Sequence, residues 1–67
     1  MPPEHILSDL NAHLSPGMLV RHPTEPGWGL GQVQSKIGTR LTVNFEDRGK
    51  VVLDATRVAL DIVAPDL

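Results

Sequence analysis

Two histidines and a carboxylate near the start of the chain have a spacing that suggests metal binding. His5, Asp9 and His13 follow one another at intervals of four residues, which would align them on one face of a helix. Imidazole and carboxylate groups are ligands for zinc or nickel. The first and last of the three would lie about 12 Å apart along the helix axis, so they could not all reach one ion. We expect a solvated helix face and no metal site.

The loop around the only tryptophan is the strongest candidate for recognition. Trp28 lies between Gly27 and Gly29, and Pro23 and Pro26 stiffen the chain before it. A rigid loop loses little entropy on binding, and an exposed indole often dominates a protein interface. Alternatively, the indole caps the open end of a core that contains one phenylalanine and no tyrosine. We take Trp28 and Gly29 as candidate protein-binding residues.

The tripeptide Arg21-His22-Pro23 leads into this loop. Strand alternation from Val20 places Arg21 outward and His22 inward at the strand end. We expect His22 to form a hydrogen bond that holds the loop, and Arg21 to offer the better contact for a partner. With Pro23, these residues complete the candidate protein-binding set.

A mildly basic surface is the alternative site. Residues 36–57 carry a local charge of +2, within a chain whose net charge is −2. Such a surface favours a protein partner, since proteins that mainly bind phosphate are strongly basic, and nucleic-acid barrels usually add aromatic platforms. Nucleic acid therefore remains the second choice of partner. The candidate nucleic-acid-binding residues are Arg40, Arg48, Lys50 and Arg57.

Catalytic chemistry finds little support in the sequence. The chain has no cysteine and no tyrosine, which excludes disulfides and thiolate metal sites. Its serines lie outside any nucleophile-elbow pattern, and no glycine-rich phosphate loop is followed by lysine. The glycines around Trp28 precede a strand, so they supply no helix N-terminus for a phosphate. We predict a protein that is not an enzyme and needs no cofactor.

A short helix is predicted over residues 3–14. Its apolar stripe ends at Ser15-Pro16-Gly17, which stops the helix. A single helix of this length is marginal in water, so we expect the stripe to pack on the rest of the domain or on a second copy, giving a homodimer. The stripe consists of Ile6, Leu7, Leu10 and Leu14.

Short strands follow the helix. The clearest alternation places Leu41, Val43 and Phe45 inward, and glycines at 38 and 49 mark the turns on either side. Five short strands joined by tight turns predict a mainly β fold, a five-stranded SH3-like or Tudor-like barrel with a short N-terminal helix. The predicted strands are Met18–His22, Gly31–Ser35, Arg40–Phe45, Lys50–Asp54 and Ala59–Val63.

The length of 67 residues fits one small domain with a stability of a few kcal/mol. We divide it into a helical segment at 1–16, a barrel at 17–64 and a loose C-terminus at 65–67. The first residues lack the basic and apolar regions of a signal peptide, and no apolar run approaches the roughly 20 residues of a membrane span. We expect a soluble cytoplasmic protein without membrane contact.

Two sequence blocks resemble known bacterial domains. The pattern Gly17-x-x-Val20-Arg21-His22-Pro23, followed by Gly29-x-Gly31-x-Val33, resembles the start of the Tudor-like C-terminal domain of UvrD/PcrA-type helicases. Residues 41–45 and 49–50 match the next strand, turn and strand of that domain. Over its full length the chain is still more similar to a small stand-alone bacterial family of uncharacterised function, typical of alphaproteobacteria.

The resemblance implies a partner. In the helicases this domain docks to RNA polymerase and tethers transcription-coupled repair, and related barrels in CarD-type regulators and the repair-coupling factor use an exposed strand edge. The loop departs from the helicase pattern, with Thr24 to Trp28 in place of a shorter basic and aromatic turn. We therefore expect a protein-interaction module that docks, through the Trp28 loop and a strand edge, to RNA polymerase or a DNA-repair or transcription factor.

Overall fold

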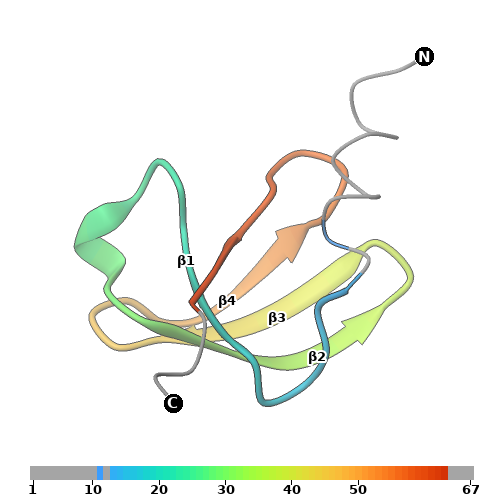
Figure 1. Ribbon diagram of the computed structural model, residues 1–67, viewed down its shortest axis with the longest axis horizontal. Coiled ribbons are helices and arrows are strands. Elements are labelled where there is room, and N and C mark those ends of the chain that lie inside the picture. The colour runs from blue at the N-terminus through green and yellow to red at the C-terminus, as the bar shows by residue number, and fades with distance from the viewer. Residues whose placement is uncertain (1–10, 12, 64–67) are drawn as a thin grey trace.

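A computed structural model describes residue 11 and residues 13–63 (Figure 1). Five antiparallel strands form one open sheet in the order β4-β3-β2-β1-β5, so β4 and β5 are its edges. The mainly β class is confirmed, whereas closure into a barrel is not. The strands are β1 (Leu19–Arg21), β2 (Gly31–Ile37), β3 (Arg40–Phe45), β4 (Gly49–Asp54) and β5 (Asp61–Ile62), and a 3-10 turn η1 covers Pro26–Trp28.

The predicted N-terminal helix is not seen in the described part of its range. Asn11 and His13 lie in a turn, and the rest of the range up to residue 10, together with residue 12, lies outside the described residues. Asparagine is unfavourable in the interior of a helix, because its side-chain amide tends to hydrogen-bond to backbone groups in non-helical conformations. Here the buried Asn11 amide bonds to the connection between β4 and β5. A dimer contact through the helical stripe stays a prediction.

Strand bounds follow the sequence pattern most closely in the centre of the sheet. β3 has the predicted bounds, while β2 continues two residues further because Ile37 still pairs with Arg40 across a turn in which Gly38 has φ 59°. β1 is shorter at both ends, and β5 keeps only Asp61 and Ile62. The side of the sheet formed by β1 and β5 therefore departs most from the predicted bounds.

The core lies on the inner face of the sheet. Leu41, Val43 and Phe45 are buried there, as the alternation predicts. The chain before β1 and the connection between β4 and β5 also contribute buried side chains, so they cover this face. A register shift between Val33 and Ser35 breaks the regular pairing of β2, and such irregularities bend a strand. The remaining core residues are Leu14, Val20, Val33, Ala55 and Leu60.

Candidate functional site

Three rings meet at one end of the core. The Trp28 ring centroid lies 4.8 Å from that of His22 and 5.2 Å from that of Phe45, both in T-shaped contacts. Edge-to-face contacts of this kind are favourable beyond the area they bury. Trp28 is half-buried and packs against the core cluster. The indole therefore caps the core while part of it stays exposed to a partner.

The turn between β3 and β4, residues 46–48, fixes the Trp28 loop. The Asp47 backbone N–H donates to the Trp28 carbonyl at 2.9 Å. Glu46 and Leu30 are joined twice, by the Glu46 N–H to the Leu30 carbonyl and by the Leu30 N–H to Glu46 Oε1, each at 2.8 Å. The Arg48 guanidinium carbon lies 5.6 Å from the Trp28 ring centroid, within range of a cation–π contact. The loop is thus held in one shape.

The other candidate protein-binding residues flank this cluster. The Thr24 backbone N–H donates to His22 Nδ1 at 3.2 Å, so His22 holds the loop as well as the indole. Gly29 has φ 76°, and a Cβ at this position would lie 2.6 Å from Asp47 Oδ2. Arg21 and Pro23 are exposed. Glycine is therefore required at 29 for structural reasons, and the exposed pair is available for contact.

The basic residues do not form one continuous strip. On the outer face of the sheet, Arg40 lies opposite Asp54 and Lys50 lies opposite Asn44, with another residue pair between them. The two other arginines lie at opposite ends of β4. Arg48 stacks on Trp28, and Arg57 Nε lies 3.7 Å from Asp54 Oδ2. The structure therefore divides the four cations: Arg40 and Arg57 both lie near Asp54, whereas Arg48 lies at the Trp28 end of β4.

The outer edge of β4 is unpaired among the described residues. The Ala55 N–H donates to the Thr39 carbonyl at 2.7 Å, which continues the β3–β4 ladder. Hydrogen-bonded positions alternate along an antiparallel pair. Val51 and Leu53 consequently direct their backbone groups toward β3. The three residues that direct theirs toward the free edge are Lys50, Val52 and Asp54.

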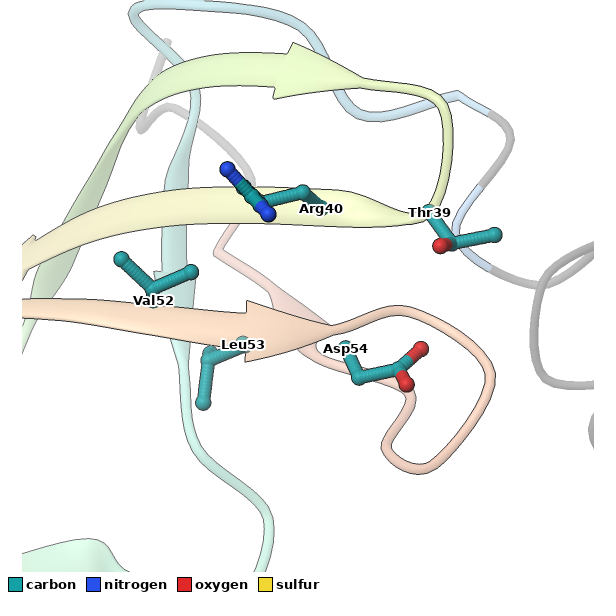
Figure 2. A pocket seen from close by; sticks show the side chains of 5 residues that line it. All are labelled: Thr39, Arg40, Val52, Leu53 and Asp54. Carbon is teal, nitrogen blue, oxygen red and sulfur yellow. The ribbon is translucent and has the colours of Figure 1, made fainter.

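The same three residues carry exposed side chains. Val52 is 59% exposed, although it lies in the middle of a six-residue strand. Beside it, a shallow hollow of about 280 Å³ opens at the Asp54 end of β3 and β4 (Figure 2). The sequence predicts a strand edge without identifying the strand, and the strand order assigns the free edge to β4. The hollow is lined by Thr39, Arg40, Val52, Leu53 and Asp54.

Asp54 closes the turn that follows β4. Its Oδ1 accepts hydrogen bonds from the Thr56 hydroxyl at 2.6 Å and from the Thr56 backbone N–H at 2.9 Å. These bonds, with a smaller contribution from the positive charge of Arg57, hold the pKa of Asp54 below its ordinary value. The carboxylate is therefore ionised at neutral pH and fixed at the end of the free edge.

The metal hypothesis finds no support in the part of the chain that the structure describes. His13 is exposed, while His5 and Asp9 lie outside that part. Among the described residues, no three histidine, cysteine or acidic side chains are grouped to hold an ion. No helix among them is long and apolar enough to span a membrane.

Comparison with known protein families matches residues 14–63 to the family described as "Protein of unknown function (DUF3553)". The chain belongs to the DUF3553 family. The matched DUF3553 region contains all five strands, the three-ring cluster and the β4 edge, and begins after the buried Asn11. A search of curated proteins and a search of solved structures each gave no match. This family membership agrees with the prediction of a small domain of uncharacterised function. Because the family description gives no function, the site is interpreted from its own geometry.

Proposed function

We propose that this protein is a non-enzymatic protein-interaction module that adds a strand of a protein partner to the β4 edge. The observation that carries the proposal is the unpaired edge itself, where Lys50 and Val52 direct backbone N–H and C=O groups away from β3. When a partner adds a strand to a sheet edge, main-chain hydrogen bonds give affinity, and pockets for alternate side chains of the added strand give specificity. The exposed Val52 side chain and the hollow beside it would provide this specificity.

The Trp28 loop extends this surface at the other end of β4. Arg48, which stacks on Trp28, directly precedes the strand. A partner strand that pairs with β4 therefore runs toward the half-buried indole. Because the loop is held by hydrogen bonds to residues 46–48, it needs little ordering when a partner binds. Arg21 and Pro23 flank His22, whose ring contacts Trp28, and both are exposed.

The identity of the partner comes from resemblance. The Arg21-His22-Pro23 block and the glycines at 29 and 31 resemble the Tudor-like C-terminal domain of UvrD/PcrA-type helicases. That resemblance supports RNA polymerase, or a repair-associated factor, as the partner in a bacterial cytoplasm. The SH3-like or Tudor-like character of the domain belongs to the same proposal.

Binding of purified bacterial RNA polymerase to the immobilised chain tests this function. We expect Val52→Pro to weaken binding at least tenfold, because proline removes an outward N–H and crowds the edge without removing a bond to β3. Arg21→Glu should weaken binding without unfolding the domain. Ile62→Ser is the matched control, since Ile62 is exposed and lies on β5, the opposite edge of the sheet.

Two results would argue against the proposal. Equal affinity of wild type and a folded Val52→Pro variant would remove the β4 edge from the binding surface. Failure of the wild type to bind the polymerase at any concentration would remove the polymerase as partner. Circular dichroism and thermal unfolding of each variant show whether the sheet is intact.

A further inference from the structure

The free edge of β4 is complementary to itself. We propose that two copies of this chain pair antiparallel through β4, about a two-fold axis at Val52, and so cover the edge until a partner displaces one copy. The inference deepens the proposed function, on which it rests for the role of the partner, by naming what occupies the same edge in the partner's absence. It stands on the backbone direction, the side-chain face and the charge order of three residues.

The backbone fits this register. With Val52 opposite Val52 of the second copy, Lys50 lies opposite Asp54 of the second copy. All three residues direct their backbone groups outward, so each pairing occupies a hydrogen-bonded position. The Val52 pair can exchange both of its bonds. Each Lys50–Asp54 pair can add a bond from the Asp54 N–H to the Lys50 carbonyl, since the Asp54 carbonyl already accepts a bond from the Arg57 N–H at 3.0 Å.

The side chains fit the same register. Lys50, Val52 and Asp54 are all exposed and lie on the outer face of the sheet. Directly opposite residues of an antiparallel pair project to the same face, where opposite charges attract and like charges repel. The pairing therefore places an ammonium opposite a carboxylate at both ends, and joins two exposed valines in the middle. Pairing centred on Lys50 or on Asp54 would place like charges opposite each other.

The cations already near Asp54 limit how much its pairing with Lys50 of the second copy adds to the attraction. Arg40 lies opposite Asp54 on β3, and Arg57 lies within 3.7 Å of its carboxylate. Lys50 of the second copy approaches from the remaining side, along the free edge. Because each carboxylate already has cations nearby, the charges select the register while the backbone bonds and the valine contact supply most of the attraction.

Self-pairing has a consequence for the edge. An unpaired strand invites association with any extended chain, and charged residues on it restrict that association to matching sequences. Here the charges permit one self-complementary match. A protein partner that adds its own strand to β4 must displace the second copy. The apparent affinity for that partner should therefore fall as the concentration of the chain rises.

Sedimentation velocity of the full chain over a wide range of concentrations tests the pairing. We expect the wild type to pass reversibly from monomer to dimer. Lys50→Glu places like charges opposite each other twice in the dimer and should raise its dissociation constant about tenfold. Asp54→Lys should do the same by creating two lysine pairs. An equimolar mixture of the two variants restores both attractive pairs, so it should dimerise nearly as well as wild type.

Two further variants keep the test decisive. Val52→Pro should be monomeric, and it covers the case in which Asp54→Lys fails to fold because the Thr56 bonds are lost. Ile62→Ser, on the opposite edge of the sheet, should dimerise like wild type. A wild type that stays monomeric at every concentration overturns the proposal, as does a Lys50→Glu variant that dimerises as tightly as wild type.

Binding of RNA polymerase separates the failure of this inference from failure of the proposed function. The affinity of wild type for the polymerase should fall as the chain concentration rises through the dissociation constant of the dimer, because the second copy then occupies the edge. A monomeric wild type whose polymerase binding is still lost in Val52→Pro would reject self-pairing alone. A wild type that dimerises through Val52 and binds no polymerase would instead reject the polymerase assignment.

Discussion

At the scale of single residues, Gly31 lies too close to the core to accept a side chain. A Cβ at Gly31 would lie 2.7 Å from two ring atoms of Phe45 and 2.8 Å from Val43 Cγ1. The Phe45 ring is fully buried and in turn supports Trp28, so it has little freedom to move. We expect Gly31→Ala to lower the free energy of unfolding by about 1–3 kcal/mol, as overpacked cores do. Urea denaturation measures the change.

Gly27 provides the control for this substitution. Among the described residues, no heavy atom would lie within 4 Å of a Cβ at Gly27, and its backbone lies outside the left-handed region. Gly27→Ala should therefore change the free energy of unfolding by no more than about 0.5 kcal/mol. Equal losses in the two variants would contradict the idea that the Phe45 ring is fixed against Gly31.

At the scale of elements, the turn after β4 should respond to acid. In the folded state, hydrogen bonds from Thr56 hold the pKa of Asp54 below its ordinary value. A carboxyl whose pKa is lowered by folding stabilises the fold above its ordinary pKa, and this contribution is lost as the pH falls through the folded pKa. We therefore expect the urea midpoint of wild type to fall more steeply below about pH 4 than that of Asp54→Asn.

Thr56→Val isolates the cause of this response. The variant removes the hydroxyl that makes the largest contribution to the lowered pKa. The pKa of Asp54, followed by NMR of its carboxyl carbon, should rise toward its ordinary value, and the acid sensitivity should shrink. An unchanged pKa in Thr56→Val would show that the hydroxyl bond is not formed in solution.

The central elements were predictable because their signals are local. In β3, apolar and polar residues alternate without interruption, and glycines with φ 59° and 83° lie in the turn before it and at the start of β4. The edge elements depend on distant contacts. Leu60 was expected in the last strand, but its N–H donates to Asn11 Oδ1, 49 positions away in the chain. No local pattern reveals such a contact, and it leaves β5 with two residues.

The same distinction applies to the candidate site. The sequence singled out Trp28 and its glycines because their types are unusual and adjacent. It did not reveal that residues 46–48 would clamp this loop, since that contact depends on where β3 ends. It also expected a closed barrel, because alternation indicates which face of a strand is buried but does not identify its neighbour. The strand order, which leaves β4 at the edge, comes only from the fold.

At the scale of the whole molecule, the net charge and the positions of the basic side chains oppose tight binding of nucleic acid. The chain carries a net charge of −2, and Arg48 and Arg57 already contact Trp28 and Asp54. Affinity for DNA grows with the number of phosphates that cations neutralise together. Because the structure separates these cations, we expect a labelled DNA duplex to bind more weakly than about 10⁻⁴ M at physiological salt, which fluorescence anisotropy measures.

The salt dependence of any binding decides whether nucleic acid should replace the protein partner. A phosphate-binding surface loses affinity steeply between low and moderate salt, and each lost contact lowers the slope by about one. Arg40 and Arg57 both lie near Asp54, so they are the two cations best placed to act together. If tight binding at low salt disappears with salt and with Arg40→Glu, the outer face binds phosphate. Otherwise we assign Arg40 and Lys50 to the sheet edge. Arg40 then pairs with Asp54 of the same chain, and Lys50 contacts the strand that is added to β4.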